Sequence, residues 1–268
     1  MIIRLYKFLY RKVITKSLDI LWNRRSIKLK KFGSKYGEWN FLDTNDLQGS
    51  IIISCGLGED ASFEIELINY YSLNVIFIDP TPRAIFHFNE LKENIGTVKS
   101  KDYSDDGAQN ISSYDLSTIT SENISLIEKA IWSSLINNLK LFFPKDISKV
   151  SLSVPNFHNN FSEDSKFIKV NTITYSSILD KYKLLKVPLL KLDIEGSEYN
   201  VISSILKNNV LPDQILVEFD ELYTYGLQQL KKYFKLHNQL TKKDYLAIKT
   251  NHFSNQLYIK KKCLKKLH

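Results

Sequence analysis

The feature that most constrains the fold of this chain is an alternation of short β-branched runs with helical patterns. Four apolar runs stand out: "SIIIS" (50–54), "NVIFID" (74–79), "PLLKLDI" (188–194) and "QILVEFD" (214–220). Continuous apolar runs of this length are typical of strands buried on both faces, and the alternation with helices predicts a mostly parallel sheet. The end of the chain, 245–261, reads as two strands joined by a short polar connection. We therefore expect an α/β fold with helices on both faces of the sheet and a C-terminal antiparallel hairpin.

The length and composition fit one large domain in a reducing compartment. The chain has 268 residues, with two cysteines, Cys55 and Cys263, which form neither a disulfide framework nor a zinc site. We expect an N-terminal helical extension over residues 1–45, a main domain over 46–268, and a cytoplasmic location. The net charge of +8 favours an anionic partner or a membrane surface, but a lysine-rich solvated surface explains it equally well.

The first 16 residues, "MIIRLYKFLYRKVITK", pattern as a basic amphipathic helix. Arginines and lysines interrupt every apolar stretch, so the segment is a poor signal peptide, and the chain has no run of about 18 apolar residues that would span a membrane. Such a helix can pack on its own domain or make weak peripheral contact with an anionic membrane. No nucleic-acid partner is expected.

A glycine turn follows the first apolar run. Gly56, Gly58 and Ala61 have the spacing G-x-G-x-x-A, which a dinucleotide-binding turn can use. Asp79 ends the next run about 20 residues later, where a carboxylate can accept hydrogen bonds from both ribose hydroxyls. Geometry alone could explain the glycines, and Asp79 could cap a helix, but together they favour a cofactor that carries adenosine.

The charge around this turn separates two such cofactors. Glu59, Asp60 and Glu64 follow the glycines closely, and carboxylates there would repel the pyrophosphate of NAD. A sulfonium ligand with a free ammonium group would be attracted instead. The acidic turn therefore favours S-adenosylmethionine.

A second acidic motif, "LLKLDIEGSEYNVI", follows the third apolar run and brings Asp193, Glu195 and Glu198 close together. Closely spaced acids raise one another's pKa, which suits a general base or a ligand clamp. Alternatively, these acids complement the dipole of the following helix. We take Asp193 as the first candidate for a catalytic base, Glu195 as the second, and His158 as a weaker third.

In this order, the motifs over residues 50–260 resemble those of FkbM-type methyltransferases, with "KLDIEGSE" the most specific part. The resemblance implies a Rossmann-like class I methyltransferase fold, S-adenosylmethionine as cofactor, and O-methylation of a hydroxyl on a sugar, a polysaccharide precursor or a related small molecule. It places Asp193 at the transferred methyl group and the acceptor. It implies this set of cofactor contacts: Ser54, Gly56, Gly58 and Asp60 at the methionine part, Asp79 at the ribose, Ala130 and Ile131 at the adenine.

Two positions depart from the family pattern. The family usually has an acid where this chain has Ser54, and a glycine where it has Asp60. Either Asp60 takes the ammonium group in place of the missing acid, or cofactor binding is weakened.

Two other functions compete with methyl transfer. An NAD(P)-dependent oxidoreductase or epimerase would use the same glycine spacing, but the lysine of a Y-x-x-x-K motif is missing after Tyr199, where Ser203 stands. A non-catalytic domain that binds a partner or a membrane through the basic N-terminus is the second alternative. No spacing typical of metal ligands is recognised.

Overall fold

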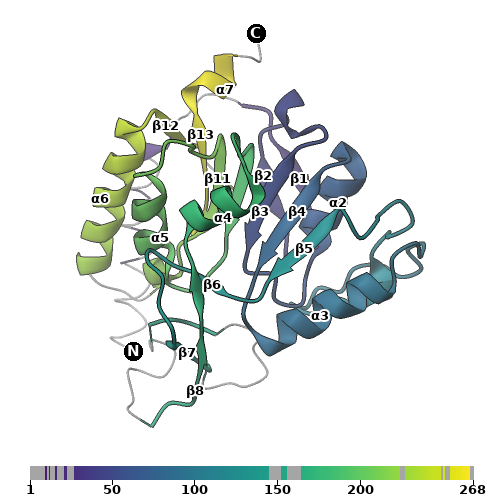
Figure 1. Cartoon of the computed structure of the whole chain (residues 1–268). Coiled ribbons are helices and arrows are strands. Elements are labelled where there is room, and N and C mark those ends of the chain that lie inside the picture. Colours follow the sequence, from purple (N-terminus) through teal and green to yellow (C-terminus); the bar gives the residue numbers. More distant parts are fainter. Residues whose placement is uncertain are drawn as a thin grey trace.

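The structure is a computed structural model of the whole chain (Figure 1). It describes residues 27–144, 152–155, 164–223, 227–248, 250 and 254–265, together with isolated positions before residue 27. His158 and most of the predicted N-terminal helix lie outside the described residues, so the predictions made for them stay predictions.

The elements alternate along the chain as the apolar runs indicate. The strands are β1 Lys30–Phe32, β2 Trp39–Phe41, β3 Ile51–Cys55, β4 Asn74–Ile78, β5 Ile124–Ile127, β6 Ala130–Ile131, β7 Leu139–Phe142, β8 Phe167–Val170, β9 Thr172–Ile173, β10 Leu189–Leu192, β11 Gln214–Glu218, β12 Tyr245–Ile248 and β13 Asn255–Lys260. The α-helices are α2 Ser62–Tyr71, α3 Pro82–Glu93, α4 Tyr175–Tyr182, α5 Glu198–Ile205, α6 Leu227–Lys242 and α7 Lys261–Lys265, and the 3-10 helices are η1 Asn45–Leu47, η2 Ile111–Ser113 and η4 Asp220–Tyr223.

The main sheet is mixed, with seven strands in the order β12-β13-β11-β10-β3-β4-β5. The neighbours from β11 to β5 pair in parallel, whereas β13 pairs antiparallel to both β11 and β12. The predicted C-terminal hairpin is therefore present. In the register of the central strands, Ile53 of β3 faces Leu190 of β10 on one side and Ile76 of β4 on the other.

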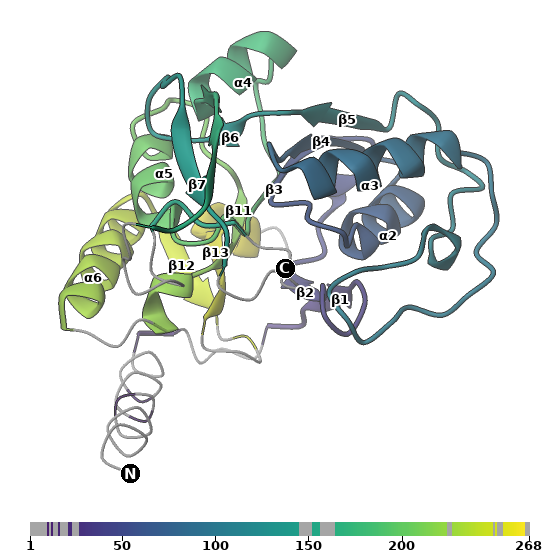
Figure 2. The same ribbon diagram turned by 90° about the horizontal axis from the view of Figure 1, so that it is seen from below.

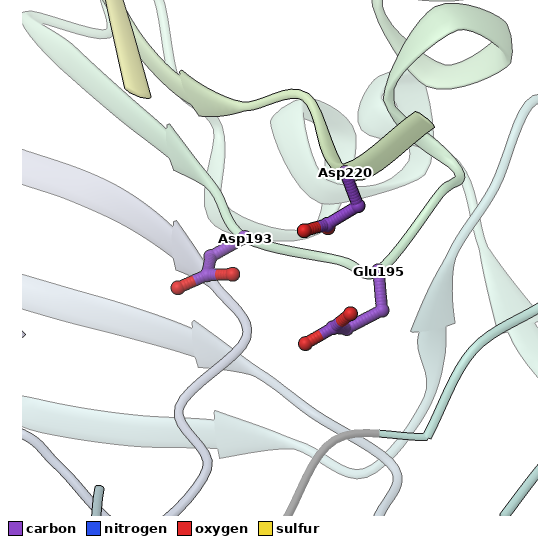
Figure 3. A group of neighbouring side chains, drawn as sticks. All are labelled: Asp193, Glu195 and Asp220. Atoms are coloured by element: carbon purple, nitrogen blue, oxygen red, sulfur yellow. The ribbon is translucent and has the colours of Figure 1, made fainter. Parts of the chain in front are cut away.

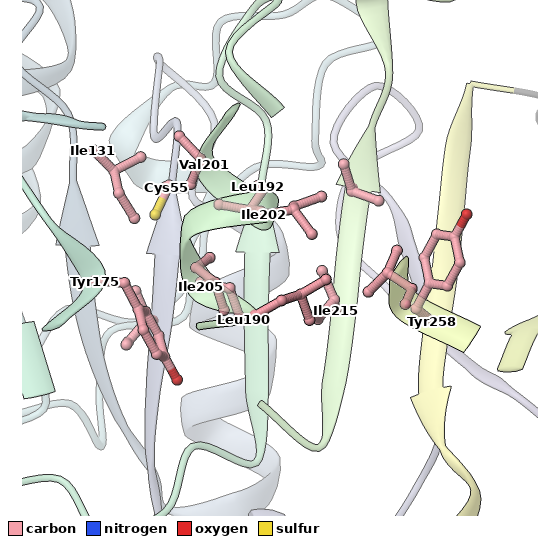
Figure 4. Packing of buried hydrophobic residues seen from close by; sticks show 14 of the residues in the cluster. Cys55, Ile131, Tyr175, Leu190, Leu192, Val201, Ile202, Ile205, Ile215 and Tyr258 are labelled. Atoms are coloured by element: carbon pink, nitrogen blue, oxygen red, sulfur yellow. The ribbon is translucent and has the colours of Figure 1, made fainter. Parts of the chain in front are cut away.

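Helices cover both faces of this sheet, as expected. Figure 2 shows α2 and α3 on one side and α4, α5 and α6 on the other. Because side chains alternate along a strand, each face has its own core. Ile53 belongs to the core beneath α4 to α6, which Figure 4 shows from close by, while its neighbour Ile52 packs beneath α2 and α3.

The described part of the predicted helical extension is not all helical. β1 and β2 form a small antiparallel hairpin in which Phe32 pairs with Trp39. Trp39 and Phe41 are buried in the same core as α2. Strands of three residues in a lysine-rich stretch are too short to show the alternation of apolar and polar residues that predicts a strand. Their packing against α2 stabilises the strand conformation instead. Where the extension ends and the main domain begins stays a prediction.

Within the described residues, no helix combines the length and the apolar character that crossing a membrane requires.

Candidate functional site

A cavity of about 1040 Å³ opens at the carboxyl ends of the central strands. It lies where β3 and β10 meet. The chain leaves β3 through α2 toward β4, and it leaves β10 through α5 toward β11, on the other side. Such a change of direction leaves a crevice in which open α/β sheets bind ligands.

The glycine turn forms one wall of the cavity because its backbone adopts conformations that favour glycine. Gly56 has a φ of +85° and Gly58 a φ of +56°. A Cβ atom on Gly56 would lie 1.7 Å from the carbonyl oxygen of Asp193. The absence of a side chain at Gly56 lets the turn touch the segment that follows β10. Both segments line the cavity and remain open to a ligand.

Asp79 follows β4 and holds the glycine turn in place. Its Oδ2 accepts hydrogen bonds from the backbone N–H groups of Leu57 and Gly58, at 3.0 and 3.1 Å. Its Oδ1 accepts from the backbone N–H of Thr81 at 2.9 Å and from the Thr81 hydroxyl at 2.7 Å. These bonds use the four acceptor positions of a carboxylate. A ribose hydroxyl would have to displace one of them.

Asp60 also lines the cavity, yet its carboxylate is turned toward the β1–β2 connection. Oδ2 accepts from the Ser34 hydroxyl at 2.5 Å and from Gln109 at 3.3 Å, and Oδ1 accepts from the backbone N–H of Ser62 at 2.9 Å. These contacts fix the hairpin turn against the start of α2. The proposed role of Asp60 toward an ammonium group stays a prediction.

Ser54 does not face the cavity. It is fully buried, and its hydroxyl donates to Glu64 of α2 at 2.5 Å. The alternation of side chains along β3 explains this, because Ser54 points to the α2 face while Cys55 points to the opposite core. The expected contact of Ser54 with the methionine part of the cofactor is not supported by this orientation.

A buried ion pair lies behind the turn. Lys191 of β10 donates to Glu64 Oε1 at 3.0 Å and to the carbonyl oxygen of Gly56 at 3.3 Å. Lys191 is 4% exposed and Glu64 is fully buried. The pair links β10, α2 and the glycine turn. The sequence interpretation missed it because the two residues lie far apart along the chain.

Ala130 and Ile131 form β6 and also line the cavity. The parallel partner of this short strand is β9, in which Thr172 faces Ala130. Both side chains are buried and apolar, which suits the flat face of an adenine.

Three carboxyl groups gather where β10 and β11 end. Asp193 and Glu195 follow β10, and Asp220 follows β11; Figure 3 shows their side chains beside one another. One carboxylate oxygen from each residue lies within 4.8 Å of those of the other two. Sequence analysis recognised no metal-ligand spacing here and did not single out Asp220, although "QILVEFD" ends in an acid just as "NVIFID" does.

Burial and mutual repulsion change the protonation of this group. Burial raises the pKa of Asp193 to about 7; Lys191 opposes the shift and Glu195 adds to it. Burial and the charges of Asp193 and Glu195 raise the pKa of Glu218 to about 8. Burial, followed by the charge of Glu195, also raises the pKa of Asp220 well above its ordinary value.

The cavity as a whole is acidic. Among the described residues, nine carboxyl side chains line it: Glu38, Glu59, Asp60, Asp79, Asp106, Asp193, Glu195, Glu218 and Asp220. Three cationic side chains line it: Lys35, Arg83 and Lys191. Arg83 pairs with Glu59, and Lys191 pairs with Glu64, which leaves little positive charge for a pyrophosphate. This excess of carboxylates favours a cationic ligand.

A comparison with protein-family models matches residues 47–246 to the methyltransferase FkbM domain. The chain belongs to the FkbM methyltransferase family. No curated protein and no solved structure matches it. This family-level result confirms the resemblance read from "KLDIEGSE" and the motifs around it. It supports a methyltransferase in general and leaves the acceptor open.

Within this FkbM-family chain, eight of the nine predicted site residues line one cavity: Gly56, Gly58, Asp60, Asp79, Ala130, Ile131, Asp193 and Glu195. Their individual roles stay predictions. The connection between β1 and β2 adds a wall that the motifs did not indicate. Tyr36 lines the cavity from that connection and Trp39 from the start of β2, and both precede the matched residues.

Proposed function

We propose that this protein is an S-adenosylmethionine-dependent O-methyltransferase with a Rossmann-like class I fold, acting on a hydroxyl of a sugar, a polysaccharide precursor or a related small molecule. The observation that carries the proposal is the position of Asp193. It lies in one cavity with the glycine turn, and its raised pKa suits a base that works near neutral pH.

The cavity fits a cationic cofactor better than a dinucleotide. Gly56 keeps the turn open to close approach, since a Cβ there would fill the space next to Asp193. The surplus of carboxylates would repel a pyrophosphate and attract sulfonium and ammonium groups. When bound, S-adenosylmethionine supplies an electrophilic methyl group. The glycine turn, Asp60 and Asp79 would hold it, with Ala130 and Ile131 at the adenine.

The protein's own contribution is to orient the acceptor and to move one proton. A hydroxyl is a poor nucleophile until a base takes its proton, and Asp193 accepts that proton on a carboxylate oxygen. Glu195 is the alternative base. Neutral polar side chains that line the cavity, including Asn40 and Gln256, can form hydrogen bonds with an acceptor rich in hydroxyls.

Calorimetry with S-adenosylmethionine, its demethylated product and NAD tests the cofactor assignment. We expect binding of the first two and none of NAD. Tight binding of NAD alone would favour an oxidoreductase or an epimerase. Absence of any adenosine ligand, both in titrations and in mass spectra of the purified protein, would favour a non-catalytic domain.

Asp193→Asn tests the base. With a panel of hydroxylated sugars and glycolipid precursors as acceptors, we expect cofactor binding to persist while turnover falls about 10²–10⁴-fold. Asp106→Asn is the matched control, because Asp106 lines the same cavity from an exposed loop. Full activity of Asp193→Asn would move the base to Glu195 or His158, and loss of cofactor binding would make Asp193 part of the cofactor pocket.

A further inference from the structure

We propose that Asp193, Glu195 and Asp220 bind a divalent cation of the Mg²⁺ or Mn²⁺ type on the floor of the cavity. The three acids leave two neighbouring parallel strands at the same edge of the sheet, and Figure 3 shows their carboxyl groups side by side. Metal binding does not require the methyltransferase proposal to be correct.

The spacing of the carboxyl groups suits a small cation. One oxygen from each lies within 4.8 Å of the other two. Ligand oxygens about 2.1 Å from an octahedral ion lie about 3–4.2 Å apart, so a slight movement of the side chains would bring them into that range. The backbone places Glu195 in the left-handed region, with a φ of +51°, a conformation that is uncommon for residues other than glycine and that often occurs at functional sites.

Two further polar atoms at this place have no protein partner. Within the described residues, Asp220 Oδ2 and the hydroxyl oxygen of Ser197 are buried and make no hydrogen bond. Ser197 is 2% exposed and follows Glu195 by two residues, and like the three acids it lines the cavity. Buried polar atoms are nearly always bonded. A bound cation or its water ligands would satisfy a carboxylate oxygen and a hydroxyl that lack a partner on residues lining an acidic cavity.

The nearby lysine does not take the place of such an ion. Lys191 directs its ammonium group to Glu64 and to the carbonyl oxygen of Gly56.

The chemistry of the ligands decides the kind of metal. The set contains carboxylates and a hydroxyl, without histidine or cysteine, and oxygen ligands alone suit Mg²⁺ or Mn²⁺ rather than zinc. An ion here would bind hydroxyl oxygens of an acceptor beside Asp193. A bound dication would lower the pKa of Asp193 and, by the same charge, that of a hydroxyl that it ligates, which would make the acceptor easier to deprotonate.

Titration of the full-length protein with Mn²⁺, followed through the electron paramagnetic resonance signal of the free ion, tests the site. We expect saturable binding that Mg²⁺ displaces. Glu195→Gln and Asp220→Asn should each weaken Mn²⁺ binding at least about tenfold, whereas Glu122→Gln, which removes an exposed acid outside the cavity lining, should bind as the wild type does. Circular dichroism checks that each variant folds. One folded variant is enough for the comparison, because each variant removes one of the three proposed ligands.

The proposal is overturned if the wild-type protein binds no Mn²⁺, or if both variants bind it as tightly as the wild type. It is also overturned if S-adenosylmethionine displaces Mn²⁺ competitively, because the acids would then be the subsite for the cationic part of the cofactor. Mn²⁺ binding without any binding of S-adenosylmethionine would leave the metal site standing and reject the methyltransferase proposal.

Discussion

Gly56 and Asp193 lie so close that no side chain fits between them: a Cβ atom on Gly56 would come within 1.7 Å of the carbonyl oxygen of Asp193. This contact joins the glycine turn after β3 to the acidic segment after β10. The two motifs that the sequence shows more than 130 residues apart therefore form one wall of the cavity.

Gly56→Ala should destabilise the fold and abolish cofactor binding. The substitution combines an unfavourable φ with a clash against backbone, which together cost about 2–5 kcal/mol. Gly49→Ala is the matched control, since Gly49 has a φ of +60° with no atom within 4 Å of the added Cβ. It should cost about 1–2 kcal/mol. Urea unfolding measures both, and equal losses would show that the close approach to Asp193 contributes nothing.

Lys191→Met should lower the free energy of unfolding by about 3–5 kcal/mol, because it leaves the buried Glu64 carboxylate without its counter-charge. Adding Glu64→Gln to the same chain should recover part of this loss. Lys31→Met breaks a half-exposed pair with Glu38 and should cost less than about 1 kcal/mol. If Lys191→Met costs no more than Lys31→Met in denaturant titrations, the buried pair is not what holds β10 to α2.

Asp79→Asn should weaken both the fold and the cofactor site. The amide nitrogen that replaces one carboxylate oxygen cannot accept hydrogen bonds, so the N–H groups bonded to that side of the side chain would lose their acceptor. This loss should lower the free energy of unfolding by about 1–3 kcal/mol. If Asp79 also holds the ribose, the affinity for S-adenosylhomocysteine should fall by about 1.5–3 kcal/mol. Calorimetry and urea unfolding of the same variant separate the two effects. A stability loss with an unchanged dissociation constant would show that Asp79 organises the turn and does not bind the ribose.

His87 should make the fold sensitive to acid. Burial lowers the pKa of this histidine, whose Nε2 lies 2.9 Å from the Tyr114 hydroxyl beneath α3. Below the ordinary histidine pKa of about 6.5, the unfolded chain therefore binds a proton that the folded protein does not, and stability falls as the pH is lowered. His87→Gln should flatten this part of the stability profile between about pH 5 and 7. An unchanged slope in unfolding titrations would mean that His87 is protonated in the folded protein.

The sequence predicted the central strands well because these strands are mostly apolar, with only Lys191 and Glu218 charged, and are followed by glycine or acidic turns. It missed the hairpin of β1 and β2, since three-residue strands among lysines carry no period and depend on their contact with α2. It also missed Asp220, which lies 25 residues beyond Glu195 along the chain but beside it in the sheet. The rule applied to Asp79, that an acid ending a buried strand lies at the ligand edge, would have found it.

The orientation of Ser54 follows from the period of its strand. Its family position suggested a cofactor contact, whereas the alternation of side chains along β3 turns it toward Glu64. The period fixes this orientation, because a side chain cannot leave its face of the sheet without shifting every neighbour, and the cofactor contact of Ser54 stays a prediction.

The stretch that identifies the family is smaller than the unit that can fold. Residues 47–246 leave out β13, which lies between β11 and β12 in the sheet. They also leave out Trp39 and Leu42. The backbone of Leu42 forms two hydrogen bonds with the side chain of Gln214 in β11. A recombinant fragment cut at the family limits would expose the edge of β11 and open one wall of the cavity, so it should aggregate. Expression trials and domain exchanges with other family members should therefore take their boundaries from the hairpin before the match and the strand after it.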